Sequence, residues 1–324
     1  MGDGIRIGIS QCLLGAEVRW DGGHKRDGFL VETFGRYVEW VPVCPEVESG
    51  LPVPRETMRL VRSPRGGALV NGVLVRLIFP KSGGDWTDEM AEWSARRTGA
   101  LEADRLDGYI LKKDSPSCGM TRVKVYGDTG PSARVGRGLF AEALMARFPD
   151  LPVEEEGRLN DPRLRENFVE RVFAYHRLRA LFDGRWTVGG LVAFHTAHKL
   201  TLLAHQPAAY RDLGRLVAGA KALPRPELKA RYTREFMAAM SVVATPAKHA
   251  NVLQHMLGHL RGKIDAPARD EIAALIEEHR RGIMPLIVPL TLLRHHVRRH
   301  EVTYLEGQTY LEPHPRELAL RNHV

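Results

Sequence analysis

Three cysteines, Cys12, Cys44 and Cys118, each follow the same kind of segment in this sequence. Apolar runs at 5–10, 38–43 and 107–111 predict a buried strand just before each of them. The last run leads into 112–119, where a Ser-Pro-Ser segment cannot continue a strand. In an open α/β sheet, the carboxyl ends of the strands share one crevice, which is where ligands bind. We therefore expect the three cysteines to converge there.

Three converging thiolates indicate a soft-metal site, because thiolates are the natural ligands of iron–sulfur clusters. Three protein ligands on a four-iron cluster leave one iron open to bind a substrate atom as a Lewis acid. The cysteines are separated by about 30 and about 70 residues and form no Cys-x-x-Cys pair, which argues against a zinc knuckle. The alternative is that all three are small buried hydrophobic residues, as free cysteines usually are.

The composition is that of an ordinary globular protein, with 27% charged and 44% hydrophobic residues and enough length for two domains. No apolar run approaches the roughly 18–20 residues of a membrane-spanning helix. Residues 1–4 lack the basic and then apolar pattern of a signal peptide. An odd number of cysteines also argues against a disulfide framework. These properties predict a cytoplasmic protein.

The net charge of +8 is unevenly distributed. Residues 1–155 carry 21 Lys and Arg against 22 Asp and Glu, whereas residues 156–324 carry 26 against 17 and hold 13 of the 14 histidines. A basic module beside a neutral one indicates a polyanionic partner, most often nucleic acid. A solubilising surface is the alternative interpretation.

The two halves also differ in their pattern of elements. Residues 1–155 alternate strands with helices near 29–36, 87–103 and 138–147, and Asn71-Gly72 marks a hairpin. With further strands at 123–126 and 151–153, this predicts a doubly wound, Rossmann-like α/β domain with the metal site at its strand ends. Residues 156–324 predict an all-α domain with helices at 162–182, 187–204, 207–221, 226–243, 246–262, 267–281 and 285–299. We expect the tail, 304–315, to be extended along a surface or packed back on the first domain.

Three blocks of the first half resemble signature sequences of the thiouracil desulfidase family. They are QCLLG at 11–15, VCPEVESGLP at 43–52 and KDSPSCG at 113–119, in the order that the family has them. In the second half, 191–200 and 210–217 resemble a helical domain often fused to this family. The fused form is similar to bacterial tRNA 4-thiouridine desulfidases.

The resemblance implies a [4Fe-4S] cluster held by Cys12, Cys44 and Cys118, with a catalytic glutamate and serine near it. By motif position these are Glu46 and Ser117, with Ser115 the less favoured serine. Glu46 follows a ligand by two residues and is placed to take a proton from a water that attacks the thiocarbonyl carbon. The structural alternatives are a charge at a helix N-terminus for Glu46 and a turn or cap for Ser117.

Basic side chains in both halves are candidates for phosphate contacts. His24, Lys25 and Arg26, together with Lys112 and Lys113, lie on loops near the first and third cysteines. His195, His198 and Lys199 share one helix face, which is a weak metal pattern because no carboxylate accompanies it. Candidates for RNA contacts in the second half are Lys199, Arg211, Arg215, Lys248, Arg294, Arg298 and Arg299.

The sequence thus predicts a two-domain enzyme in which 1–155 removes sulfur from 4-thiouridine and 156–324 binds the tRNA that carries it. The target base must leave its stack to reach the cluster. One alternative is the same reaction on free thiouracil or a thionucleotide. Others are a non-enzymatic iron–sulfur sensor that binds nucleic acid, and a zinc-bound structural domain.

Overall fold

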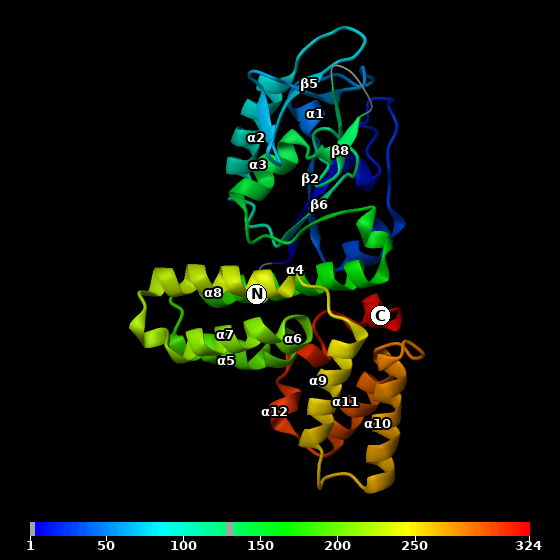
Figure 1. Ribbon diagram of the computed structural model, residues 1–324, viewed down its shortest axis with the longest axis vertical. Helices are drawn as coiled ribbons and strands as arrows, with labels where there is room; N and C mark the ends of the chain where they lie inside the picture. Colours follow the sequence, from blue (N-terminus) through cyan, green and yellow to red (C-terminus); the bar gives the residue numbers. More distant parts are fainter. Residues whose placement is uncertain (1–3, 128–131) are drawn as a thin grey trace. The chain divides into compact units, whose positions relative to one another are not determined.

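Four parallel strands form the sheet around which the first half of the chain folds (Figure 1). The computed structural model describes residues 4–127 and 132–324. In spatial order, β2-β1-β6-β9, the strands are Glu39–Val43, Arg6–Ser10, Gly108–Leu111 and Val153–Glu155. The chain passes from β1 to β2 on one side and later returns to β6 on the other, so the sheet has its topological switch point between β1 and β6. The strands predicted before the three cysteines are confirmed.

The remaining strands of this unit form a second, mixed sheet, so the prediction of one doubly wound sheet is wrong. In the order β4-β5-β3-β7-β8 they are Ala68–Val70, Val73–Ile78, Arg59–Arg62, Val123–Tyr126 and Ala133–Gly136. The strand expected at 123–126 exists, but β7 pairs with β3 and β8. Its residues alternate between buried Val123 and Val125 and exposed Lys124, a pattern typical of a sheet with one solvated face. By contrast, β6 is buried along its whole length.

The hairpin predicted at Asn71-Gly72 is confirmed between β4 and β5. Both turn residues have positive φ, 48° and 76°, as a tight hairpin turn requires. The Asn71 side chain donates to the carbonyl of Val135 in β8 at 3.0 Å. The turn at one edge of the second sheet therefore reaches the strand at its other edge.

Two helices, α2 (Thr87–Ala100) and α3 (Leu139–Arg147), pack against each other, and both contact β4 of the second sheet. The ring of Phe140 lies 5.5 Å from that of Trp93 in α2 and 5.8 Å from that of Tyr109 in β6. Tyr109 in turn lies across Gly8 of β1, where an added Cβ would approach its ring to 2.2 Å. This aromatic layer is the core beneath the strand ends, and it requires glycine at position 8.

The second unit, Asp161–Val324, is helical, as the sequence predicts. Asp161 caps its first helix by accepting hydrogen bonds from the backbone N–H groups of Arg163 and Leu164. The helix predicted at 187–204 is instead two helices separated at His198, a break that no proline or glycine marks. The helices α4 to α12 are Pro162–Phe182, Val188–Ala197, Lys199–His205, Pro207–Ala218, Arg225–Met240, Pro246–His259, Ala266–Arg280, Ile287–Arg299 and Thr303–Glu306.

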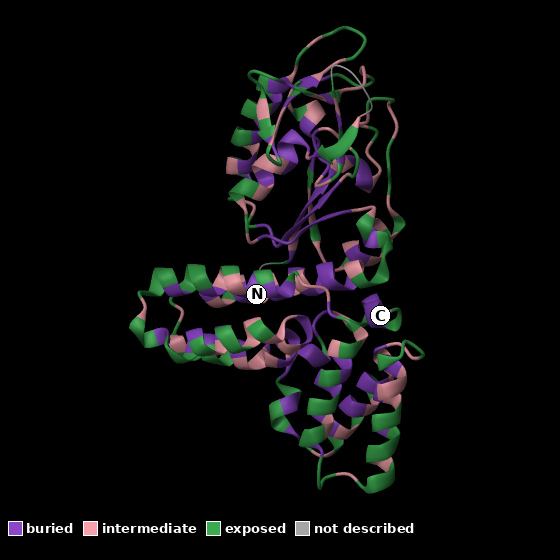
Figure 2. Cartoon of the chain, viewed as in Figure 1, coloured by how far each residue is buried: buried purple, intermediate pink, exposed green. Residues whose placement is uncertain are grey.

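The tail is not an extended segment, so that expectation is wrong. It forms α12 and short helical turns, in which buried residues alternate with exposed ones (Figure 2). Leu305, Tyr310 and Leu311 lie in the same core as residues of α9 to α11. Arg321 is buried there and donates to Glu166 of α4 at 3.0 Å. The tail is therefore an integral part of the helical unit. Within the described residues, no helix is both long and apolar enough to cross a membrane.

Candidate functional site

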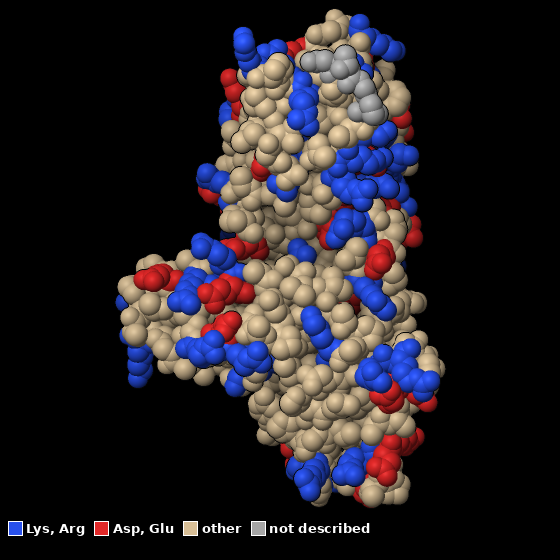
Figure 3. All heavy atoms as spheres, in the orientation of Figure 1, with Lys and Arg blue, Asp and Glu red and all other residues tan. Residues whose placement is uncertain are grey.

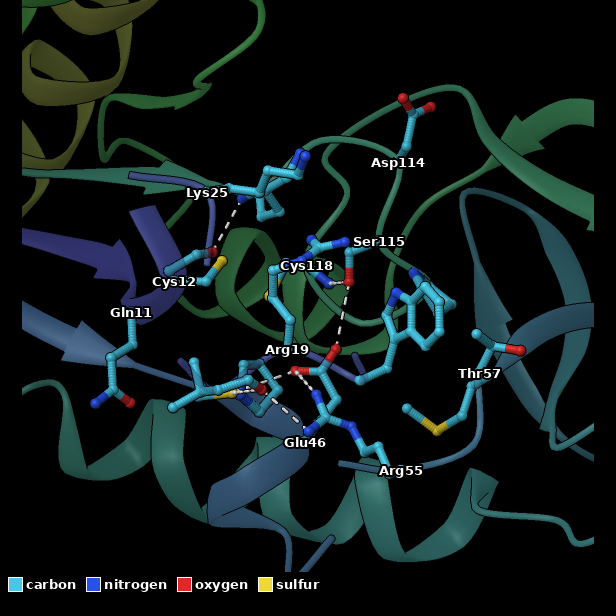
Figure 4. Close-up of a pocket in the computed structure, with 18 of the residues that line it drawn as sticks. Gln11, Cys12, Arg19, Lys25, Glu46, Arg55, Thr57, Asp114, Ser115 and Cys118 are labelled. Atoms are coloured by element: carbon cyan, nitrogen blue, oxygen red, sulfur yellow. Dashed lines mark hydrogen bonds and ion pairs between the residues drawn. The ribbon is translucent and has the colours of Figure 1, made fainter. Parts of the chain in front are cut away.

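All three cysteines line one cavity of about 320 Å³ at the carboxyl ends of the parallel strands (Figure 4). Cys12 lies in the helical turn Gln11–Leu14 after β1, Cys44 directly follows β2, and Cys118 lies in the loop after β6. Each is at most 9% exposed. The three cysteines were expected to meet at a sheet crevice, and their side chains do line one cavity there. They meet because the strands that precede them, β2, β1 and β6, are neighbours in the sheet.

Local hydrogen bonds fix the first two cysteines. The carbonyl of Cys12 accepts from the backbone N–H of Gly15, whose φ of 103° closes the turn, and from that of Lys25 at 2.9 Å. Cys44 is extended and immediately precedes Pro45, the first residue of the short helix α1 (Pro45–Glu48). Its backbone N–H donates to the carboxylate of Glu48, four residues later, at 2.9 Å.

The loop that carries Cys118 is held by the N-terminus of α3. Free backbone N–H groups of this helix need acceptors, and those of Leu139 and Ala141 donate to the carbonyls of Pro116 and Ser117 at 3.2 and 3.1 Å. The contact is close because position 138 is glycine: an added Cβ would lie 2.2 Å from the carbonyl oxygen of Ser117. The helix therefore sets the position of the loop.

Glu46 is the centre of a hydrogen-bond network in the cavity wall. Its Oε1 accepts from the hydroxyl of Ser117, and the Ser115 hydroxyl lies 3.5 Å from the same oxygen. Its Oε2 lies 4.0 Å from a guanidinium nitrogen of Arg55 and 3.6 Å from the sulfur of Cys44. The carboxylate is therefore held between two hydroxyl groups and a cation, beside one of the thiols.

The two serines differ in what they face. Ser115 lines the cavity, whereas Ser117 is completely buried behind it. The two hydroxyl oxygens are 2.9 Å apart, and Ser115 Oγ also accepts from the backbone N–H of Cys118 at 3.1 Å. Ser115 is thus the hydroxyl within reach of a ligand, and Ser117 supports Glu46 from below.

Burial keeps the three thiols protonated. Burial, with a further contribution from the charge of Glu46, raises the pKa of Cys12 to about 11 and that of Cys44 to about 12. The same two causes raise the pKa of Cys118 well above its usual value. A ligand that needs thiolates must therefore bring positive charge and displace protons, as a metal centre does.

The three thiols are the side chains of this cavity that could hold a soft metal centre. Within residues 4–127 and 132–324, no three His, Cys, Asp or Glu side chains are grouped closely enough to hold one metal ion. The ligands of a four-iron cluster bind different irons, so they stand farther apart than those of zinc. Three thiols around one cavity are the type of ligand that iron–sulfur clusters use.

The other predicted residues are scattered. Lys25, Lys112 and Lys113 line the cavity, whereas His24 and Arg26 are exposed outside it, and Arg26 pairs with Glu32 at 3.0 Å. Lys199, Arg211 and Arg215 belong to the helical unit, where Arg215 pairs with Asp212. His195 and His198 are buried there: His195 lies 3.2 Å from the hydroxyl of Tyr232, and His198 accepts from Arg177.

Two segments of the wall are not among the predicted site residues. They are Val18, Arg19 and Trp20, and Arg55 to Met58, which lie outside regular helices and strands. Backbone bonds join them, since the N–H of Arg55 donates to the carbonyl of Trp20 at 2.9 Å. The first of these segments could have been identified from the sequence, because the Arg-Trp-Asp-Gly-Gly turn at 19–23 follows Cys12 closely.

Comparison with known proteins gives a family match in each half of the chain. The model of a family described as 2-thiouracil desulfurase matches residues 7–156, and that of a family described as a protein of unknown function (DUF1722) matches residues 199–315. The uncharacterized protein YbgA of Escherichia coli (strain K12) is 35% identical over 165 residues, which are 51% of this chain and 98% of YbgA. The uncharacterized protein YbbK of Bacillus subtilis (strain 168) is 30% identical over 157 residues, 47% of this chain and 97% of YbbK.

Among solved structures, a [4Fe-4S]-dependent thiouracil desulfidase, TudS, is similar to this chain. It is 30% identical, and the match covers 48% of this chain and 93% of the TudS chain, with a TM-score of 0.38.

Proposed function

The chain belongs to the 2-thiouracil desulfurase family through residues 7–156, and on this premise we propose that it replaces the sulfur of a thiolated pyrimidine by oxygen from water. The thiocarbonyl and one water give a carbonyl and hydrogen sulfide, with no net oxidation or reduction. The observation that carries this proposal is the single cavity in which three thiols, Glu46 and Ser115 meet.

Cys12, Cys44 and Cys118 would hold a [4Fe-4S] cluster, which three thiols around one cavity fit. When bound, such a cluster supplies an open, thiophilic iron that polarises the carbon–sulfur bond. The rest of the chemistry belongs to the side chains of this chain.

Glu46 is the general base and acid of the proposed reaction. It lies in the cavity beside Cys44, and a guanidinium nitrogen of Arg55 lies 4.0 Å from its Oε2. It takes a proton from the attacking water and returns it to the departing sulfur, a role typically worth about 10²–10⁴ in rate. Ser117 and Arg55 hold the carboxylate from two sides, so the group is oriented before the substrate arrives.

Ser115 is the hydroxyl that meets the substrate in this proposal. It lines the cavity and lies next to the Glu46 carboxylate, whereas Ser117 is completely buried. The Ser115 hydroxyl can donate to the pyrimidine ring or to the negative charge that develops in the transition state. The motif position alone favoured Ser117.

For the form of the substrate, we propose 4-thiouridine in tRNA. The support is a second cavity, of about 480 Å³, on α11 of the helical unit. Four arginines, Arg294, Arg298, Arg299 and Arg316, line it together with His295 and Thr291. Glu312 contacts two of these arginines, so the remaining charge is positive and suited to phosphate groups. On the face in Figure 3, other Lys and Arg side chains are interspersed with Asp and Glu.

Free thiouracil is the second candidate substrate, because the matched family is described by that base. An anaerobic assay separates the two. The protein is purified without oxygen, and loss of thiocarbonyl absorbance is followed with thiolated tRNA, with 4-thiouridine and with 2-thiouracil. We expect a brown protein that acts on the tRNA, and an Arg298→Glu/Arg299→Glu variant with weaker tRNA turnover and unchanged 2-thiouracil turnover. An equal loss of tRNA turnover and 2-thiouracil turnover in this variant contradicts the tRNA proposal. Activity of the natural protein on the free base alone contradicts it as well.

The sensor alternative predicts a different result. A non-enzymatic iron–sulfur sensor binds nucleic acid with an affinity that depends on its cluster and turns over none of the three substrates. In that case Glu46→Gln changes nothing measurable, whereas an enzyme loses turnover and keeps its colour.

A further inference from the structure

The cavity has one large aromatic side chain that is left open to solvent. Trp20 is in its lining and is 46% exposed. Within residues 4–127 and 132–324, no hydrogen bond or ring contact engages the indole. Most other large aromatic residues of this unit are packed in pairs, such as Trp93 with Phe140 and Trp86 with Phe79. A single exposed hydrophobic residue is ordinary on a protein surface, but this one stands in the wall of the site.

The backbone that carries Trp20 is fixed on both sides. A turn closes over it, since Gly22 donates to the carbonyl of Arg19 at 3.0 Å and Asp21 accepts from the backbone of Gly23 at 3.1 Å. The Trp20 carbonyl accepts from the backbone of Arg55, and the Arg55 side chain donates to the carbonyl of Val18 at 3.0 Å. Arg55 therefore joins the Trp20 segment to Glu46, so the indole and the carboxylate are held by one framework.

We propose that Trp20 is the platform on which the flat ring of the substrate stacks. The inference rests on the proposed function and specifies it further: the ligand is a planar heteroaromatic thione, and a saturated thioamide is excluded. A cavity of about 320 Å³ is at the small end of ligand pockets and suits one base. An aromatic side chain can stack on the face of any base, so stacking fixes the plane of the substrate ring. The polar groups of the cavity, Glu46 and Ser115, then select the edge that carries sulfur.

Binding of uracil, the sulfur-free product base, tests the platform without any turnover. Calorimetric titration of the purified protein with uracil should show binding that Trp20→Phe retains within a few fold. Trp20→Leu and Trp20→Ala should weaken it about tenfold to a hundredfold, the usual contribution of base stacking. Leucine keeps apolar bulk without a flat ring, so it separates stacking from general hydrophobic contact. Leu69→Ala is the matched control, because Leu69 is 64% exposed on β4 and does not line the cavity.

Turnover gives the second measurement. With 2-thiouracil, Trp20→Ala should raise KM by the same factor and change kcat by only a few fold. The ring of dihydro-2-thiouracil is not flat, so its KM should be the same with and without the tryptophan. Uracil binding that is equal in the tryptophan, leucine and alanine forms overturns the platform, whether or not the protein is an enzyme. If uracil binding needs an aromatic residue at 20 but no thione is turned over, the platform stands and the proposed reaction fails.

Discussion

Glu46 is the proton-transfer group of the proposed reaction, and its carboxylate contacts Ser117 and Arg55. We expect Glu46→Gln to keep the fold, because the amide can still accept from Ser117 through its oxygen. It should also keep the three thiols in place and the brown colour of a loaded protein. Turnover should fall about 10²–10⁴-fold, because an amide cannot carry the proton. Anaerobic steady-state kinetics and the visible spectrum of the same sample measure both.

Glu56→Gln is the control for that substitution. Glu56 lines the same cavity, but it accepts hydrogen bonds from the backbone of Ser82 and Lys81 and does not contact Glu46. Its amide form should leave kcat within a few fold of the natural value. A comparable loss in both variants would assign the effect to the charge of the cavity and contradict a proton-transfer role for Glu46.

At the residue scale, the sequence predicted the groups whose chemistry is tied to a motif. Cys12, Cys44 and Cys118 could be placed at one edge of the sheet because a strand leads into each block and the strand ends must meet. Glu46 was selected only by its position in a family motif, and it lines the same cavity. Trp20 and Arg55 were missed because irregular segments carry them, and their place in the wall depends on how two loops pack. Sequence position alone does not distinguish Ser115 from Ser117 either. The conformation of the loop that carries Cys118 decides that Ser115 faces the cavity and Ser117 is buried.

The position of the Cys118 loop depends on its contact with the N-terminus of α3. A Cβ at position 138 would lie 2.2 Å from the Ser117 oxygen and 2.8 Å from the Cys118 nitrogen, which are backbone atoms that a rotamer change does not relieve. Gly138→Ala should therefore cost about 1–3 kcal/mol of unfolding free energy and displace the third thiol. Denaturant unfolding and the iron content of anaerobically prepared protein are the measurements.

Gly99→Ala is the matched control at this scale. Gly99 lies in α2 with nothing within 4 Å of an added Cβ. Alanine should stabilise that helix by up to about 1 kcal/mol and leave the iron content unchanged. Full iron content in Gly138→Ala would show that the loop holds its place without the close helix contact, against this account.

At the element scale, the existence of strands and helices was largely predictable, and their partners were not. The strand at 123–126 was found, but its alternating burial places it in the second sheet with β3 and β8. The sequence pattern was present at Val123, Lys124 and Val125, yet pairing depends on residues far away in the chain. The break at His198 depends likewise on tertiary contacts, because the Arg177 side chain donates to the ring of His198.

At the scale of the whole chain, the helical unit carries buried histidines that make its stability depend on pH. His195, His198 and His249 are each at most 4% exposed. Burial lowers the pKa of His195 to about 4 and those of His198 and His249 to about 3, with Arg177 adding to the effect at His198. A hydrogen bond and the charge of Glu170 overcome the effect of burial and raise the pKa of His205. Acid therefore destabilises the folded unit through the first three histidines and stabilises it through His205.

The sign of the effect follows from which state binds the proton. Below pH 6.5 the unfolded chain protonates these histidines, but the folded unit keeps His195, His198 and His249 neutral until pH about 3–4. Each should therefore lower the unfolding free energy by about 2 kcal/mol at pH 5. The stabilising contribution of His205 is present below pH 6.5 and is lost as the pH rises through its raised value, so it offsets part of this loss. We expect the helical unit to be less stable at pH 5.0 than at pH 7.5.

Hydrogen exchange of the slowest amides within Asp161–Val324, in the full chain at pH 7.5 and 5.0, measures this difference. His198→Met removes one titrating group with a side chain of similar volume. It also removes the acceptor for Arg177, so the variant should be less stable at both pH values. The loss between the two pH values should nevertheless shrink by about 2 kcal/mol, because one proton fewer distinguishes the unfolded chain from the folded one. An unchanged pH dependence in His198→Met would mean that His198 is accessible to protons in the folded unit, in conflict with its burial among Phe194, Phe236 and Arg177.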